Sequence, residues 1–384
     1  MRGLNIFTVL TVAVLLSGCA GAPPAPGASP LETANPSSSP SAAAPSEPVS
    51  RLGLTCNDML PASLVASAIN TGMTTTDVMV NPASATPLGY AVSQLGGLSC
   101  EAGVGVSTVS GGSEAGYSSV NVQILPGASA LWASSEEKNP AVVSGAGARY
   151  GDASAITCLG QSAQSACSAD ILAGDTWIAV SARGINVAAS VGDEALAEHV
   201  DPLLANMVAS VMKASSPTLA WTAPVTASGL PDECSVYATA DEFRALFGTT
   251  EEIAIGGGDD GEGSGLDNAA WSAAGVERCT WVPATTGQTW PLYVTALPGG
   301  AWAFDRSSAL MAAGGSVQAV AEPLAGIDRA TFGCHVYSGT CTLDTVIAGN
   351  WVQFNAETAG IGAADAVRTQ LMKVAERAAI RFAA

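Results

Sequence analysis

The sequence predicts an α+β fold built twice in tandem, each copy being an α/β/α-layered domain with a mostly antiparallel sheet covered by helices. Three observations predict it. Eight cysteines form two groups of four with nearly the same spacing, and two short segments of the first repeat recur in the second. Strand-like segments are joined by short turns, which favours antiparallel pairing, and amphipathic helical segments can cover a sheet. The recurring segments are Val122–Gly127 with Val294–Gly299, and Asp170–Trp177 with Asp344–Trp351.

The first fifty residues predict export and lipid attachment. Arg2 precedes an apolar stretch from Leu4 to Leu16, shorter than the roughly 20 residues a membrane-spanning helix needs, so residues 1–18 are expected to be a signal peptide. Leu16-Ser17-Gly18-Cys19 resembles the lipobox of bacterial lipoproteins, which implies acyl chains on Cys19. Residues 19–50 are rich in Ala, Pro and Ser, so we expect a disordered tether there.

Two domains of ordinary size follow the tether. The first repeat is expected over residues 51–213, a linker over 214–232 and the second repeat over 233–384. Cys56 and Cys234 are 178 positions apart, because 234 − 56 = 178. This period is far longer than that of a solenoid repeat, and each copy is long enough to bury its own core.

Each repeat is expected to follow the order α-β-β-α-β-β-β-α. In the first repeat, the elements are predicted at 61–69, 97–105, 118–125, 127–137, 155–159, 167–173, 175–183 and 192–213. Pro202 is expected to break the last of these helices. In the second repeat, Thr239 and Glu242 form a capping box, and Gly248 can end the helix that it starts. The later elements are predicted at 278–284, 290–296, 298–313, 331–337, 341–347, 350–357 and 362–382.

The eight cysteines of the repeats are expected to be oxidised, since an exported protein meets an oxidising compartment. Four cysteines allow three pairings in each repeat. We favour a long and a short bond in each, because the short pair fits a β-hairpin; metal ligation is the rival interpretation, and the Cys-x-x-Cys spacing of zinc sites is missing. The favoured pairs are Cys56–Cys100, Cys158–Cys167, Cys234–Cys279 and Cys334–Cys341.

Composition argues against several functional classes. The formal net charge is −19, so nucleic-acid binding is not expected, and contact with anionic membranes should be through the lipid alone. The two histidines, His199 and His335, lie in different repeats. No nucleophile is spaced to pair with either, and no zinc-ligand set surrounds them. We therefore expect no catalytic residue, metal or cofactor.

The second repeat carries a resemblance. Cys234 is followed by a Thr-Ala-Asp-Glu-Phe-Arg-Ala-Leu-Phe-Gly helix and then by Cys279-Thr-Trp281. This pattern resembles a family of uncharacterised actinobacterial cell-envelope lipoproteins, and the fold this implies is similar to the PsbP/Mog1-like α/β/α sandwich. In the first repeat, Cys100-Glu-Ala102 replaces Cys-x-Trp and Asn70 replaces the Gly that ends the helix. The resemblance implies no activity and no catalytic residue.

Two segments of the second repeat could contact a ligand. Residues 256–267 are glycine-rich and acidic, and Asp259, Asp260, Glu262 and Asp267 could gather around calcium. The run lacks the EF-hand register, so a mobile loop is the preferred interpretation. Six of the eight tryptophans follow residue 220. Trp281, Trp302 and Trp351 are expected in the core, whereas Trp271 and Trp290 are expected in loops or at strand ends as surface contacts.

The expected function is therefore a non-enzymatic binding or interaction module, lipid-anchored on the outer face of the cell membrane. It would contact an envelope protein or molecule through the second repeat or the groove between the repeats. A carrier of a small apolar ligand is the first alternative, and an enzyme is the second. A large apolar pocket would favour the carrier, and a packed core would argue against it.

Overall fold

The computed structural model describes residues 47–383 except for short gaps. Those gaps are 70–73, 78–84, 105–117, 137–141, 161–164, 186, 188–191, 215–217, 219, 224–228, 232, 258–264, 285–291, 314, 316, 336–338 and 358–362. Contacts divide the chain into Met1–Ala44 and one compact unit, Pro45–Ala384, that holds both repeats. The described residues begin at 47, so Cys19 and most of the tether predicted over residues 19–50 lie outside them.

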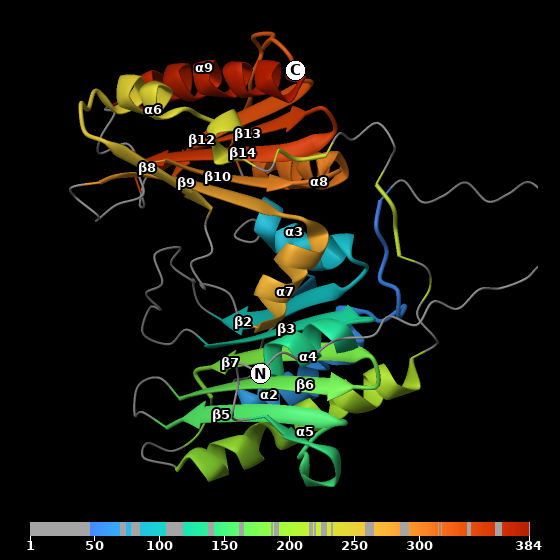
Figure 1. Cartoon of the computed structure of the whole chain (residues 1–384). Helices are drawn as coiled ribbons and strands as arrows, with labels where there is room; N and C mark the ends of the chain where they lie inside the picture. The colour runs from blue at the N-terminus through green and yellow to red at the C-terminus, as the bar shows by residue number, and fades with distance from the viewer. Residues whose placement is uncertain are drawn as a thin grey trace, which may run out of the picture. The chain divides into compact units, whose positions relative to one another are not determined.

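Each repeat forms one seven-stranded antiparallel sheet with helices on both faces, which confirms the predicted α+β fold (Figure 1). The first sheet has the order β1-β2-β3-β7-β6-β5-β4, and the second has the equivalent order β8-β9-β10-β14-β13-β12-β11. The strands of the first sheet are β1 Thr74–Asp77, β2 Leu98–Val104, β3 Ser118–Pro126, β4 Val143–Ser144, β5 Ala153–Leu159, β6 Ala166–Ala173 and β7 Thr176–Arg183. The strands of the second are β8 Ile253–Gly257, β9 Glu277–Pro283, β10 Leu292–Leu297, β11 Gln318–Ala319, β12 Arg329–His335, β13 Thr340–Ile347 and β14 Asn350–Glu357.

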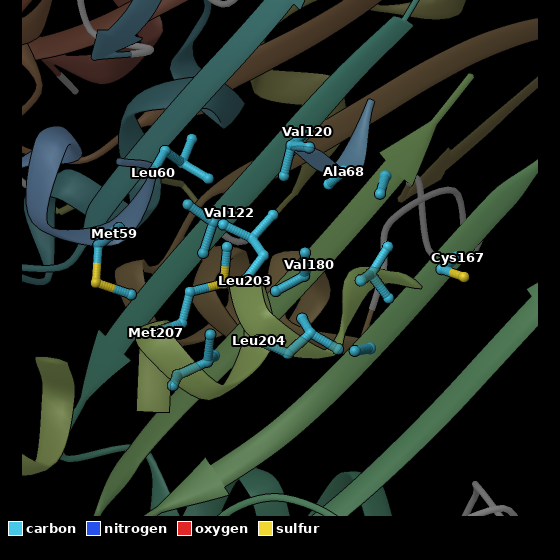
Figure 2. Packing of buried hydrophobic residues seen from close by; sticks show 14 of the residues in the cluster. Met59, Leu60, Ala68, Val120, Val122, Cys167, Val180, Leu203, Leu204 and Met207 are labelled. Atoms are coloured by element: carbon cyan, nitrogen blue, oxygen red, sulfur yellow. The ribbon is translucent and has the colours of Figure 1, made fainter. Parts of the chain in front are cut away.

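One face of each sheet carries a core that belongs to its own repeat. In the first repeat, helices α1 Cys56–Met59, α2 Ala62–Ala68 and α5 Asp193–Lys213 cover this face. Figure 2 shows side chains of these helices meeting Val120, Val122 and Val180 of the sheet. In the second repeat, η4 Cys234–Val236 with α6 Ala240–Phe247 and α9 Ala364–Phe382 cover the equivalent face.

The other face of each sheet is covered partly by a helix of the opposite repeat. Helix α3, Pro87–Gln94, precedes β2 and contacts β2 and β3 of its own sheet, but it also packs against β10, β14 and α8 Ala301–Ala313 of the second repeat. Helix α7, Gly265–Ala274, precedes β9 but packs against β3, β7 and α4 Ser129–Glu136 of the first repeat. The two helices also contact each other (Figure 1). Each repeat thus places one helix against the sheet of the other, and we call α3 and α7 the exchanged helices.

The exchange joins the apolar cores of the two repeats. Tyr90 and Ala91 of α3 lie in a buried cluster with Trp351 of the second sheet. Leu266 and Ala270 of α7 lie in a second buried cluster with residues of the first sheet. Burial of apolar area on each side stabilises the contact by about 25 cal/mol per Å² removed from water.

Several local predictions are confirmed. Thr239 Oγ1 accepts from Glu242 N at 3.2 Å, and Glu242 Oε2 accepts from Thr239 N at 2.8 Å. Gly248 ends α6 in the left-handed region with φ 62°, which glycine adopts without steric cost. The structure also contains four disulfides, with the pairings that the spacing favoured: Cys56–Cys100, Cys158–Cys167, Cys234–Cys279 and Cys334–Cys341.

Three predictions of local structure are wrong. The order α-β-β-α-β-β-β-α omits a strand and a helix in each repeat, β1 with α3 and β8 with α7, and a short edge strand, β4 or β11. Helix α5 runs through Pro202 without a break, because Val200 and Leu203 on either side of it are buried against the same core. The acidic run was expected to be a loop over 256–267, but β8 extends to Gly257 and α7 starts at Gly265. Asp259, Asp260 and Glu262 lie outside the described residues.

Candidate functional site

A pocket of about 440 Å³ lies on the first sheet, on the face turned toward α7. Its lining comes from four adjacent strands, β2, β3, β7 and β6, with Gly89 of α3 and Asp267 of α7. The volume is in the range of small-molecule sites. Because Asp267 and Gly89 belong to the exchanged helices, the pocket lies at the junction of the two repeats.

Strand register determines which residues present their side chains to the pocket. Ser99 is paired with Gln123, Gln123 with Ala179, and Ala179 with Asp170. Side chains of directly paired residues share one face of a sheet, so these four point the same way. Their chain neighbours Cys100, Val122, Ala169 and Val180 also line the pocket, but these residues belong to the apolar core of the opposite face. They reach the pocket with their backbone, and the side chains around it are mainly polar or small.

Asp170 is held in the pocket wall by a tryptophan. Trp177 Nε1 donates to Asp170 Oδ1 at 2.9 Å, and Trp177 is fully buried, packed edge-to-face on Trp132. Burial raises the pKa of the Asp170 carboxyl, the hydrogen bond from Trp177 opposes that rise, and the nearby Asp267 carboxylate adds to it. Asp267 is held in turn by Gln123, whose Nε2 donates to Asp267 Oδ1 at 2.6 Å.

Ser99 contributes an unsatisfied hydroxyl. Its side chain is 2% exposed, lines the pocket, and its Oγ has no hydrogen-bond partner in the described part of the chain. A buried hydroxyl without a partner costs free energy, on the order of 1–3 kcal/mol. A ligand or a water molecule that hydrogen-bonds to Ser99 would recover part of this cost.

The equivalent place in the second repeat is filled. Counting from Trp177 and Trp351, Gln353 replaces Ala179 and Asn355 replaces Ser181. Counting from the recurring segments Val122–Gly127 and Val294–Gly299, Tyr293 replaces Asn121. Asp344 replaces Asp170 and keeps the bond to its tryptophan, with Trp351 Nε1 donating to Asp344 Oδ1 at 2.8 Å. The same register thus carries an open pocket in one repeat and larger side chains in the other.

The larger side chains form a hydrogen-bonded chain. Thr342 Oγ1 donates to Asn355 Oδ1 at 2.8 Å, Asn355 Nδ2 to Gln353 Oε1 at 3.2 Å, and Gln353 Nε2 to Asp344 Oδ1 at 2.8 Å. Burial, opposed by the hydrogen bonds from Gln353 and Trp351, raises the pKa of Asp344 to about 6. The Asp344 carboxyl is therefore buried and hydrogen-bonded within the second repeat.

Of the two tryptophans suggested as surface contacts, the structure describes Trp271. Trp271 is in helix α7 rather than in a loop, and is only partly buried. Its Nε1 donates to Leu88 O at 3.2 Å, and the guanidinium of Arg278 lies 5.2 Å from its ring centre. Trp271 therefore contributes to the contact between the repeats. Trp290 lies outside the described residues.

The three tryptophans expected in the core differ. Trp281 and Trp351 are fully buried, as predicted. Trp302 is only half-buried: its Nε1 donates to Gln94 Oε1 at 3.3 Å, and its ring packs on Tyr90. It too lies at the contact between the repeats.

The remaining polar groups give no second site. Within the described ranges, Cys234, Glu277 and Cys279 are the one group close enough to share a metal ion, but both sulfurs are bonded in the Cys234–Cys279 disulfide. His199 lies half-buried on α5. His335 ends β12. In the part of the chain that the structure describes, no helix is long and apolar enough to span a membrane.

Comparison with known proteins adds no name for this arrangement. No family model matches the chain, and no curated protein matches it. A search of solved structures found the "di-domain ARO/CYC StfQ from the steffimycin biosynthetic pathway", 12% identical over 82% of this chain and 97% of that chain, with a TM-score of 0.17. A likeness this weak carries no functional argument, so the site rests on its own geometry.

Sequence reasoning missed the pocket. It expected contact through the second repeat or the groove between the repeats, and it named Asp267 only as one of four acids that could gather around calcium. It identified none of the residues of the first sheet that line the pocket. The signal that could have found it is the position-by-position comparison of the repeats, in which small residues face large ones around the retained Asp170 and Asp344.

Proposed function

We propose that this chain is a non-enzymatic binding module of the cell envelope that holds a small polar molecule in the pocket of its first repeat. The observation that supports the proposal is the contrast between the repeats: Ala179 and Ser181 leave a cavity where Gln353 and Asn355 fill the equivalent space. Four disulfides fit an extracytoplasmic location.

The polar side chains that face the pocket favour a polar ligand over an apolar one. Both large cores of the described residues are occupied by packed side chains, and the side chains that face the pocket include Ser99, Asn121, Gln123 and Asp170. These groups hydrogen-bond to water in an empty pocket. An apolar ligand would displace that water and offer no hydrogen bonds in its place, which costs free energy. The carrier of an apolar ligand is therefore the less favoured proposal.

The pocket is tested by filling it with the side chains of the other repeat. The double variant Ala179→Gln with Ser181→Asn places there the residues found in the second repeat. Ligand-observed NMR with a library of polar fragments should detect binders to the full chain that the double variant loses. Ala254→Gln, an exposed alanine on β8, is the matched control and should keep them. Binders that survive the double variant would show that they bind elsewhere.

Attachment through Cys19 is part of the same proposal and has its own test. Mass spectrometry of the protein purified from its native envelope should show acyl chains on Cys19 at the new N-terminus. Cys19→Ala should abolish both the added mass and the membrane association, because one signal peptide alone leaves no anchor. An unmodified Cys19 in the mature protein would contradict the lipid anchor and leave the pocket proposal standing.

A further inference from the structure

Two carboxylates from different repeats meet at the pocket. Asp170 comes from β6 of the first sheet, and Asp267 comes from the first turn of α7, which the second repeat contributes. Burial raises the pKa of the Asp170 carboxyl, and the charge of the Asp267 carboxylate raises it further. Neighbouring carboxylates repel each other, and a cation near both removes that repulsion.

Among the described residues that line the pocket there is no Lys, Arg or His. Neutral side chains donate to both acids, Trp177 to Asp170 and Gln123 to Asp267. The described lining therefore offers a ligand two carboxylates and no basic side chain.

The unpartnered hydroxyl of Ser99 is an independent observation at the same place. It is 2% exposed and shares a face with Gln123, its cross-strand partner. Gln123 in turn holds Asp267. The same pocket thus contains, besides the two acids, a buried hydroxyl that lacks a hydrogen bond in the described part of the chain.

The second repeat lacks this pair. Asp344 is retained there, but Leu88 of α3 stands at the position of Asp267, twelve residues before Cys100 as Asp267 is before Cys279. The exchanged helix therefore brings an acid to the first sheet and an apolar side chain to the second. The acidic pair occurs where the pocket is open.

We propose that the pocket recognises a small polar molecule through a protonated amine held between Asp170 and Asp267, with Ser99 hydrogen-bonding to another polar group of the ligand. The inference rests on the proposed function, since it names the ligand class of the same pocket. A protonated amine offers up to three donors, and hydrogen bonds to charged groups are stronger than those between neutral groups.

The test uses two sets of probes, each with an amine, a neutral analogue and an anionic analogue of similar size. The first set is glucosamine, glucose and glucuronate, and the second is phenethylamine, phenethyl alcohol and phenylacetate. Each is titrated at pH 7.5 into the ¹⁵N-labelled full chain, and amide shifts of the pocket strands are followed. In at least one set the amine should bind at least tenfold more tightly than its neutral and anionic partners. Shifts that do not depend on charge, or that favour the anions, would overturn the amine.

Variants assign the effect to the pair. Asp170→Asn and Asp267→Asn keep an oxygen that can accept from Trp177 and Gln123, so each should fold while weakening amine binding on the order of tenfold. Asp344→Asn makes the same change in the filled repeat and should leave amine binding unaltered. Equal loss from all three variants would contradict the assignment.

Two further outcomes separate this inference from the pocket itself. Calcium chloride is titrated alone and then against the bound amine. Calcium that binds alone and displaces the amine at submillimolar concentration would assign the pair to a metal ion and overturn the amine. If neutral probes bind and are lost in the Ala179→Gln, Ser181→Asn variant, the pocket function stands without the amine. If no probe shifts the pocket strands, the pocket function fails as well.

Discussion

The two repeats share a framework and differ at one site. They have the same strand order, the same disulfide pairs and the same hydrogen bond from a buried tryptophan to an aspartate. Around that aspartate, the first repeat has small side chains and a pocket, and the second has Gln353, Asn355 and Tyr293. Side-chain volume at a few strand positions therefore separates a repeat with an open pocket from one in which the same place is packed.

Both repeats contribute to the pocket, because each repeat places one helix against the sheet of the other. Helix α7 of the packed repeat contributes Asp267 to the pocket of the open one, and α3 of the open repeat packs on the sheet of the packed one. The second repeat thus supports the site that it does not contain. Experiments on the shared framework should affect both repeats alike, and experiments on the site should separate them.

The largest expected effect concerns the framework. Replacing both cysteines of the long disulfide by alanine should lower the free energy of unfolding by about 4 kcal/mol in either repeat, because the closed loops span 44 and 45 positions. Loss of the short bond Cys158–Cys167, which spans 9 positions, should cost about 2.6 kcal/mol on the same loop-entropy model. Urea denaturation measures all three. Clearly unequal costs of the two long bonds would show that the frameworks are not equivalent.

The next effect comes from emptying the filled site. Gln353→Ala with Asn355→Ser gives the second repeat the small residues of the first, and it leaves Asp344 with one donor fewer. We expect a loss of about 2–3 kcal/mol in the free energy of unfolding, since a buried acceptor loses its partner. The reverse change, Ala179→Gln with Ser181→Asn, should cost less stability, because it adds side chains where the pocket leaves space. Similar losses for both double variants would mean that the first site is not an open pocket.

A pH effect follows from Asp344. Its pKa in the folded protein is about 6, above the usual 3.8, so the folded state binds its proton more tightly than the unfolded chain does. The stability that this proton contributes is complete below pH 3.8 and is lost as the pH rises through about 6. Asp344→Asn should remove this dependence. At pH 7.5 it should raise the free energy of unfolding by about 3 kcal/mol relative to the original chain, once the change that the same variant causes at pH 4 has been subtracted.

The equivalent change in the open repeat sharpens the comparison. The pKa of Asp170 is raised as well, chiefly by burial, so Asp170→Asn should change the pH dependence in the same direction. The effect should be smaller, because Asp170 is only partly buried. Thermal denaturation between pH 4 and 7.5 compares the two variants with the original chain. A profile of Asp344→Asn parallel to that of the original chain would contradict the raised pKa.

Much of the framework could be predicted from the sequence, because it is encoded in local patterns and repeated spacing. Paired cysteine groups, a capping box at Thr239 and alternating strands all leave signals within a few residues. Helices α3 and α7 leave weak ones: α3 contains Gly89, and α7 follows a glycine-rich acidic run. Both are stabilised by packing against the opposite repeat, and contacts between distant segments have no local signature.

The site could not be predicted for a related reason. A pocket consists of missing side-chain volume, and Ala179 and Ser181 are ordinary residues in a strand. Burial raises the pKa of Asp170, and Asp267 adds to the rise. Asp267 is 97 residues further along the chain, because 267 − 170 = 97. Charge and aromatic content pointed to the second repeat, whereas the small residues that open the pocket belong to the first.

The smallest expected effect tests the exchange of helices. Thr86 caps α3, its Oγ1 accepting from Gly89 N at 3.1 Å, as Thr239 caps α6. Thr86→Ala and Thr239→Ala should each lower the free energy of unfolding by about 1 kcal/mol, and serine at either position should restore most of it. Global stability alone would therefore not distinguish the two caps.

Amide hydrogen exchange distinguishes them by location. Helix α6 packs within its own repeat, against β8, so Thr239→Ala should increase exchange in α6 and leave the pocket strands unaltered. Helix α3 contacts α7, and its Leu88 carbonyl accepts from Trp271 of α7, so Thr86→Ala should also increase exchange in α7. Because α7 presents Asp267 to the pocket, the same variant should weaken ligand binding without touching a pocket side chain. Exchange confined to α3 would show that the two helices are not coupled, and the pocket would then depend on the first repeat and α7 alone.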